Sequence, residues 1–376
     1  MKESLRSRFR QAIQVLFSLT HLQKTVLIGA VLIGTVVSTY FVVNHQQIPQ
    51  VDAGEVLGAQ PGELALTDLP ADPILEDTKV ITILLLGYGG AGHQGGMLSD
   101  AIQVASIDFE KKQISLISIP RDLSVTLPGV GEQKINEAFS LGTGDDVIES
   151  GAQLAKQMAQ AVTGIPVHYY AAIDFVGLKR LIGEEFDGIT VQVEETLDDP
   201  WYPISGSEQD PCGHSAEEIA TFTNTLSGFE LEKQFECRYE HIYFPVGEVE
   251  MNGGDALAFV RSRHGSAGGD FSRSRRQWSL LLAIKDELFA MDALSAVEPT
   301  YRFITDHVST DVDLEFLKKI APALTNADKF EIKRVGISTE NILVSSRNGR
   351  GQFVLYPKSG TSDWESVQDF VARELE

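Results

Sequence analysis

The sequence predicts an α/β fold, an αβα sandwich with a mixed central β-sheet, preceded by one N-terminal transmembrane helix. Strand-like apolar runs alternate with amphipathic segments along most of the chain, which is typical of a sheet covered by helices. An uncharged apolar stretch near the N-terminus stands apart from this pattern. The 376 residues are 43% apolar and 22% charged, a composition that indicates a globular protein.

Residues 25–43, TVLIGAVLIGTVVSTYFVV, are long enough to cross a hydrocarbon core of about 30 Å as a helix. Residues 1–24 carry five cations against one anion, so the positive-inside bias predicts a cytoplasmic tail here and an extracytoplasmic remainder. A cleaved secretory signal is disfavoured, because its apolar region would span only about 7–15 residues and no small-residue cleavage site fits well. We therefore expect a single-pass anchor.

Residues 44–79 mix Gln, Pro, Gly, Asp and Ala without apolar periodicity, which predicts an extracytoplasmic linker. Folded sequence begins with the apolar run 80–86, a buried strand that leads into the glycine-rich loop 87–96. The runs 101–108 and 113–120 are joined by the short polar FEKK, so we expect an antiparallel hairpin.

The next elements alternate between helix and strand. Apolar spacing predicts a helix over about 147–162, with Thr143 or Asp145 as N-cap and Gly164 after its end. The expected elements that follow are a strand at 168–175, a helix at 176–185, a strand at 189–193, and helices at 254–261 and 271–290.

Residues 198–246 are polar and rich in Pro, Gly and acidic side chains, which indicates an insertion within the main folded domain, spanning 80–292. The two cysteines of the chain, Cys212 and Cys237, lie in it. We expect them to form one disulfide because an extracytoplasmic compartment permits it, with two unpaired thiols as the alternative.

Residues 293–376 are predicted to form a C-terminal lobe, either part of the same fold or a small separate domain. Its expected elements are a helix at 313–324, strands at 330–337 and 352–357, and a terminal helix at 364–375.

The formal net charge of −22 argues against a general nucleic-acid binder, so any phosphate site must be a local basic patch. Five arginines lie close together in such a patch, at 261, 263, 273, 275 and 276. Guanidinium groups bind phosphate through paired hydrogen bonds, which makes a pyrophosphate ligand the leading interpretation and surface salt bridges the alternative. On a helix, Arg273, Arg276 and Gln277 share one face, whereas Arg275 points elsewhere.

Three other segments contain residues that could carry chemistry. Arg121 follows a predicted strand and could bind phosphate, with Asp122 to orient it; the alternative is that the two residues only pair with each other. For Lys134 and Asn136 the same two interpretations, phosphate binding or structural pairing, stay open. Asp100, between the glycine-rich loop and a strand, could bind Mg²⁺ that bridges phosphate oxygens. The loop itself matches neither a Walker A motif nor a dinucleotide fingerprint.

Taken together, these motifs resemble the LytR-CpsA-Psr family from about Ile81 to Ala290. The resemblance rests on ILLLG followed by SDA, then KKQISLISIPRD, KINEAF, HYYAAIDFVGLKRLI and GGDALAFVRSRHGSAGGDFSRSRRQ, in this order.

The resemblance implies an αβα core with an apolar tunnel for a polyprenyl chain and a basic mouth for its pyrophosphate. The implied catalytic residues are Arg121, Arg261, Arg263 and Asp270; the implied pyrophosphate ligands are Arg121, Lys134, Arg261, Arg263, Arg273, Arg276 and Gln277; Asp100 would hold Mg²⁺. Asp270 and Arg276 would also position the segment.

The implied reaction transfers a polyprenyl-pyrophosphate-linked glycopolymer to a peptidoglycan hydroxyl, outside a bacterial cell membrane. The alternatives are hydrolysis of the lipid pyrophosphate, or a non-catalytic wall-polymer binding or regulatory role.

The chain departs from the family at the metal site. The family commonly has Asp where this chain has Gly89, and Arg where it has Leu98. One carboxylate and one arginine are therefore missing, so either Asp122 or His93 compensates or the metal is bound more weakly.

Overall fold

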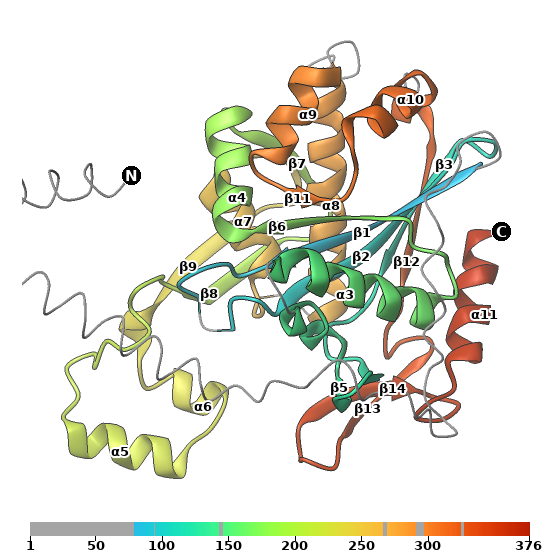
Figure 1. Cartoon of the computed structure of the whole chain (residues 1–376). Coiled ribbons are helices and arrows are strands. Elements are labelled where there is room, and N and C mark those ends of the chain that lie inside the picture. The colour runs from blue at the N-terminus through green and yellow to red at the C-terminus, as the bar shows by residue number, and fades with distance from the viewer. Residues whose placement is uncertain (1–78, 94, 143–145, 266–268, 291–296, 325–326) are drawn as a thin grey trace, which may run out of the picture. The chain divides into compact units, whose positions relative to one another are not determined.

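The structure is a computed structural model that describes residues 79–376 except 94, 143–145, 266–268, 291–296 and 325–326, with the backbone alone at 269–271 and 328 (Figure 1). The predicted tail 1–24, span 25–43 and almost all of the linker 44–79 lie outside these residues. Within the described ranges, no helix combines the length and the apolar character needed to cross a membrane.

A six-stranded mixed sheet forms the centre of the described chain, in the order β11-β6-β1-β2-β3-β12. β1 runs antiparallel to β2 and parallel to β6, and β3 runs antiparallel to β2 and parallel to β12. The bounds are Val80–Tyr88 (β1), Ser99–Asp108 (β2), Gln113–Ser118 (β3), Tyr169–Asp174 (β6), Ser309–Thr310 (β11) and Glu331–Gly336 (β12). The predicted α/β class, mixed sheet and antiparallel hairpin are confirmed.

Helices cover both faces of this sheet because β1 places apolar side chains on both sides. Leu84 and Leu86 face α3 (Val147–Thr163) and α11 (Trp364–Leu375), whereas Ile81 packs with Phe316 of α10 (Leu314–Leu324) on the other side. That second side also carries α4 (Phe175–Arg180), α8 (Gly269–Ala290) and α9 (Val297–Thr305), as Figure 1 shows.

The ends of α3 test the capping prediction. Gly164 ends the helix in the left-handed conformation with φ of 72°, as predicted. The N-cap is Asp146, whose side chain accepts a hydrogen bond from Glu149 N at 2.9 Å, rather than Thr143 or Asp145. Asp146 directly precedes the helix, and only from that position does a carboxylate reach the third amide of the first turn.

Two other sequence predictions change in detail. The expected helix 176–185 is α4 followed by a π-helical turn, Leu181–Glu185. The strand β7 (Ile189–Val193) pairs with β10 (Gly247–Met251) in a small separate sheet beside α7 (Gly253–Arg261). Further two-stranded pairs are β4 (Ser124–Leu127) with β5 (Gly131–Lys134), and β13 (Leu343–Arg347) with β14 (Phe353–Pro357).

Residues of the C-terminal lobe 293–376 contribute both edge strands of the central sheet, β11 and β12. The lobe thus shares backbone hydrogen bonds with the preceding chain.

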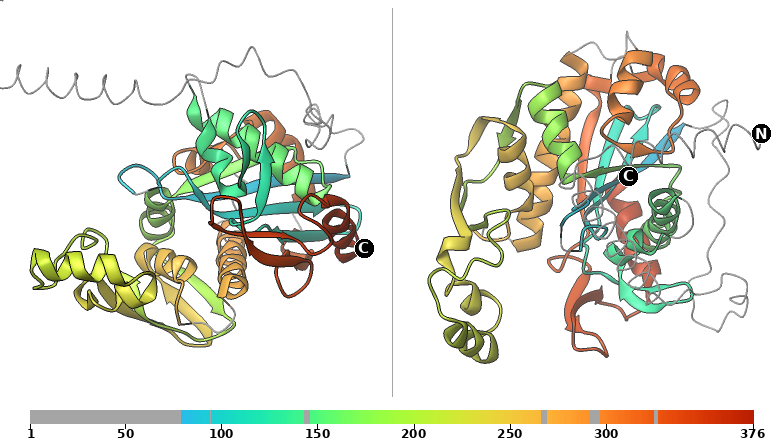
Figure 2. Two further views of the ribbon diagram at one scale, coloured as in Figure 1. Left: turned by 90° about the horizontal axis from the view of Figure 1, so that it is seen from below. Right: turned by 60° about the vertical axis from the view of Figure 1, so that its left-hand side comes forward.

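The insertion 198–246 is built on an antiparallel pair, β8 (Leu197–Pro203) with β9 (Tyr239–Phe244), and carries α5 (Ala216–Thr225) and α6 (Phe229–Glu232) at its far end. It extends away from the central sheet in every view (Figures 1 and 2). Cys212 and Cys237 form the predicted disulfide, with their Cα atoms 5.6 Å apart.

Candidate functional site

A cavity of about 730 Å³ lies between the sheet and the helices of its second side. Its wall is apolar over most of its length. Ile83 and Leu85 of β1 are only half-buried, although they lie in a central strand, because they face this space. The helix α8 contributes one face, Gln277, Leu281, Ile284 and Leu288, and α9 and α10 contribute residues that include Phe303, Ile304, Leu317 and Leu324.

Basic side chains line one end of the cavity, which we call the mouth. Arg121 follows β3, and Arg261 is the last residue of α7, with Arg263 two residues beyond it. Arg273 and Gln277 lie on the first turns of α8. The structure therefore brings together five of the predicted pyrophosphate ligands from three separate parts of the sequence. Convergent guanidinium groups beside an apolar space suit an amphiphile with an anionic head group.

Arg261 is held by aromatic neighbours. Its Nη1 donates to the hydroxyl of Tyr202 at 3.4 Å, and its guanidinium carbon lies 4.3 Å from the ring centroid of Phe175. Burial raises the pKa of Tyr202, so this hydroxyl stays protonated and neutral. The cation–π contact fixes the orientation of the planar guanidinium without neutralising its charge.

Arg263 lies at the mouth, facing the other arginines. Desolvation, followed by the positive charges of Arg121 and Arg261, lowers its pKa from 12.5, while Asp100 acts in the opposite direction. The group remains charged at neutral pH. Like charges held together in this way favour binding of a multivalent anion, because the anion removes their mutual repulsion.

A buried network supports the loop that carries these arginines. The Oγ of Ser262 donates to Asp199 Oδ2 at 2.6 Å, and Arg276 Nη2 donates to the carbonyl of Ser262 at 2.6 Å. Asp199 and Arg276 are almost completely buried. Desolvation lowers the pKa of Arg276 to about 10. Arg276 therefore positions the loop, and the structure does not bring it to the mouth with Arg273.

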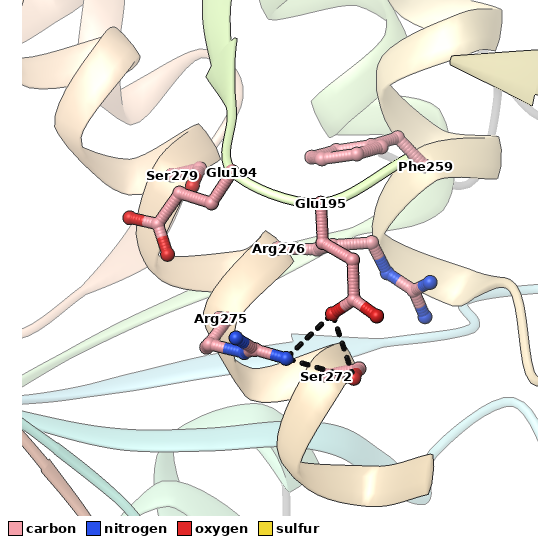
Figure 3. A pocket seen from close by; sticks show the side chains of 7 residues that line it. All are labelled: Glu194, Glu195, Phe259, Ser272, Arg275, Arg276 and Ser279. Atoms are coloured by element: carbon pink, nitrogen blue, oxygen red, sulfur yellow. Dashed lines mark hydrogen bonds and ion pairs between the residues drawn. The ribbon is translucent and has the colours of Figure 1, made fainter. Parts of the chain in front are cut away.

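Arg275 turns to the opposite side of α8, as the helical spacing predicted. Its guanidinium contacts Glu195 Oε2 at 2.6 Å and Ser272 Oγ at 3.2 Å (Figure 3). Lys134 also stays away from the cavity, because its Nζ donates to Asp122 Oδ1 at 2.5 Å. The side chain of Asp270, at the start of α8, lies outside the described part.

Gln277 is oriented by a neighbour on the sheet. Its Oε1 accepts a hydrogen bond from Gln103 Nε2 at 3.2 Å, and both residues line the cavity. The amide NH₂ of Gln277 is thereby directed away from Gln103, which leaves it as a donor for a phosphate oxygen.

Asp100, the predicted Mg²⁺ ligand, lines the mouth and forms an ion pair with Arg121. Its carboxylate fits a cation held mainly by substrate phosphates, since Mg²⁺ in phosphate sites takes only one or two protein carboxylates. At the position of the family's second carboxylate, a β-carbon on Gly89 would lie 2.6 Å from Cδ2 of His93, so a side chain there requires the exposed imidazole to move. Asp122 forms ion pairs with Lys134 and Arg121 and is not among the residues that line the cavity.

Across the described residues, the group of three His, Cys, Asp or Glu side chains with ligand atoms close enough for one ion is Asp210, Cys212 and Cys237. Both cysteines are in the disulfide, so this group does not offer a metal site. His93 lines the mouth instead and makes an edge contact with Phe175 at 5.1 Å between ring centroids.

Several residues at the mouth were not singled out from the sequence. Phe175, Tyr202 and Asp199 hold the arginine loop, and Trp201 and Tyr239 line the same end of the cavity. The aromatic and acidic content of the insertion was the available signal, but it did not indicate that these residues face the arginines.

The fold and site define an α/β protein with an apolar cavity that opens onto clustered arginines. The chain belongs to the LytR-CpsA-Psr family, whose family model (LytR_cpsA_psr) it matches over residues 59–359.

Curated relatives give the same assignment. The chain is 25% identical over 250 residues to the polyisoprenyl-teichoic acid–peptidoglycan teichoic acid transferase TagU of Enterococcus faecalis, a match covering 66% of each protein. It is 28% identical over 242 residues to the regulatory protein MsrR of Staphylococcus aureus, covering 64% of this chain and 58% of MsrR. The matches span about half to two thirds of the length of such relatives, with 50% for the transferase TagV of Bacillus subtilis.

Solved structures share the fold. TagV of Bacillus subtilis superposes with a TM-score of 0.53 at 24% identity, covering 79% of this chain and 97% of TagV. TagT bound to LI-WTA superposes with a TM-score of 0.52 at 19% identity, covering 84% and 98%.

Proposed function

We propose that the protein is a membrane-anchored, extracytoplasmic phosphotransferase that moves a glycopolymer from a polyprenyl pyrophosphate carrier to a peptidoglycan hydroxyl. The observation that carries this proposal is the apolar cavity whose mouth is lined by Arg121, Arg261, Arg263 and Arg273. A polyprenyl chain matches the apolar part, and a pyrophosphate matches the arginines. The activities named for TagU and TagV support a polyisoprenyl-linked polymer as donor and peptidoglycan as acceptor, without fixing the polymer.

In the proposed reaction, the acceptor oxygen attacks the sugar-side phosphorus, and the bond between that phosphorus and the bridging oxygen breaks. A phosphodiester forms, polyprenyl phosphate leaves, and the hydroxyl proton ends on the departing phosphate or in solvent. The arginines orient the pyrophosphate and neutralise charge that develops on the leaving group. Mg²⁺ held by Asp100 and the substrate phosphates would add to this neutralisation.

The proposed location follows from residues 25–43, an uncharged apolar stretch preceded by a basic tail. An anchor of this kind would hold the mouth near a lipid carrier embedded in the same membrane.

A binding or regulatory function is the second candidate. It is favoured by Gly89, which stands where the family commonly has an aspartate, and by the regulatory role named for MsrR.

The test is incubation of the detergent-purified full chain with a polyprenyl-pyrophosphate disaccharide and Mg²⁺, with and without a peptidoglycan oligomer. Mass spectrometry should find polyprenyl phosphate and a phosphodiester-linked adduct when the acceptor is present. Polyprenyl phosphate release without an adduct would indicate a hydrolase. Binding without any turnover would indicate the second candidate.

A further inference from the structure

The inner end of the insertion presents a wall of aromatic side chains. Trp201 lies 5.2 Å from Phe229 and 5.4 Å from Tyr239 between ring centroids, with both contacts edge-on. His264 stacks on Phe229 at 5.0 Å. Trp201, Tyr239 and His264 line the same cavity as the arginines. We call Trp201, Phe229, Tyr239 and His264 the aromatic wall.

A backbone irregularity brings this wall to the mouth. Neighbouring residues of a regular strand point to opposite faces of a sheet, yet Trp201 and Tyr202 both line the cavity. The register of β8 against β9 shifts between Asp199 and Tyr202. Such bulges re-aim side chains. Because of the shift, Trp201 faces the cavity together with Tyr202, whose hydroxyl contacts Arg261.

We propose that the aromatic wall is a saccharide subsite that packs against the sugar attached to the pyrophosphate, and that it selects an uncharged or amino-sugar glycan over a phosphate-rich polymer. The proposal rests on the proposed function, because the position of the sugar follows from a pyrophosphate held by the arginines. Once the lipid occupies the apolar part of the cavity, the sugar side of the pyrophosphate must face outward, toward the insertion.

The chemistry of the wall fits a sugar. Trp and Tyr offer flat apolar faces with a polar edge, which match the C–H face and the hydroxyl rim of a pyranose ring. Glu232 adds an acceptor, since its Oε2 is buried without a hydrogen bond and lies 3.8 Å from His264 Nε2. The Glu232 side chain as a whole is 39% exposed and lines the cavity, so a sugar hydroxyl can donate to its carboxylate there.

The insertion carries a strongly negative net charge, which bears on the kind of polymer that can lie along it. Residues 198–246 contain ten acidic and two basic residues, a net charge of −8 with histidine neutral. Both cations are already engaged: Lys233 contacts Glu230 at 2.6 Å, and Arg238 lies over the ring of Phe235 at 3.7 Å. A polymer with a phosphate in every repeat would be repelled along this surface, whereas a neutral or amino-sugar chain would not.

The test measures binding of three ligands to the full chain in detergent micelles by calorimetry. The ligands are a polyprenyl pyrophosphate without sugar, the same lipid with a neutral disaccharide, and the same lipid with a glycerol-phosphate oligomer. We expect the disaccharide to strengthen binding about tenfold over the bare lipid, and the oligomer to give no such gain.

Two variants and a matched control test whether the gain in affinity from the disaccharide comes from the aromatic wall. Trp201→Leu should abolish the disaccharide gain, measured as the ratio of the two affinities, with and without the sugar, in the same variant. The matched control is Phe222→Leu, which removes a ring that packs on His214 and Phe235 in the same insertion, outside the residues that line the cavity. It should keep the gain. Glu232→Gln, which preserves shape, should reduce the gain several-fold even if Trp201→Leu disturbs the insertion.

The outcomes are distinct. Tight binding of the bare lipid with no disaccharide gain in the unaltered protein would overturn the subsite while leaving the proposed function intact. Equal binding of the oligomer and the disaccharide would overturn the charge selection. Failure of the bare lipid to bind would overturn the proposed function, and the subsite with it.

Discussion

The imidazole of His93 occupies the space that a side chain at position 89 would need, since a β-carbon on Gly89 would lie 2.6 Å from its Cδ2. Gly89 is not among the glycines with positive φ, so its backbone suits any residue. The position of the exposed His93 side chain, rather than the backbone conformation, therefore determines whether a carboxylate can be placed here, because the imidazole would have to move. The conformation of the glycine-rich loop, which brings His93 against Gly89, is thus linked to the absence of an aspartate at position 89.

This arrangement predicts a non-additive effect on metal binding. Gly89→Asp alone should destabilise the loop without tightening Mn²⁺ binding, because the new side chain collides with His93. Gly89→Asp with His93→Gly should bind Mn²⁺ about tenfold or more tightly than the unaltered protein, since two carboxylates then face one space. Electron paramagnetic resonance of Mn²⁺ measures this without any turnover. Tight binding by the single Gly89→Asp variant would show that His93 does not block the site.

The arginines at the mouth should differ sharply from their neighbours on α8. Arg263→Ala should lower kcat about 10²- to 10³-fold, because it removes a donor from the developing phosphate charge. Arg263→Lys should recover part of this loss, since it restores the charge without the planar fork. Arg275→Ala is the control, because Arg275 contacts Glu195 away from the cavity. Equal losses for Arg263→Ala and Arg275→Ala would contradict the assignment.

The apolar cavity should discriminate by lipid length. Ile284→Trp places a large ring among the lining residues of α8, so the KM for a long polyprenyl substrate should rise at least about tenfold while a substrate of two or three isoprene units is little affected. Thermal stability should not fall, because the ring fills existing space. Asp286→Trp, at an exposed position of the same helix, controls for the added ring. Unchanged long-chain kinetics in Ile284→Trp would place the lipid elsewhere.

The disulfide should stabilise the insertion rather than the whole fold. Removing it with Cys212→Ser and Cys237→Ser frees a loop with a sequence separation of 25, which costs about 3 kcal/mol in the chain-entropy account. Limited proteolysis should cleave the variant faster within 204–238, while the central sheet keeps its unfolding temperature. A matching loss of stability in the sheet would mean that the insertion and the sheet unfold together.

The sequence was informative where local patterning and burial agree. The apolar run at 80–86 and the hairpin that follows it were predictable, because a strand covered on both faces needs apolar residues throughout. The strand β7 was predicted from its sequence, but its pairing with β10 was not. The alternation of buried and exposed residues in β7 indicates which face of that strand is covered, and it does not indicate which strand lies beside it.

At the candidate site, too, some features followed from the sequence and others only from the tertiary structure. The sequence by itself determined that an acidic chain carries a compact arginine cluster, and helical periodicity correctly separated Arg275 from Arg273 and Gln277. Only the tertiary structure decided that Arg276 turns inward to Ser262, that His93 fills the space at Gly89, and that Trp201 meets the arginines. Periodicity specifies directions around one helix axis. Contacts between distant segments depend on how the packed elements are placed against one another, and no local pattern encodes that placement.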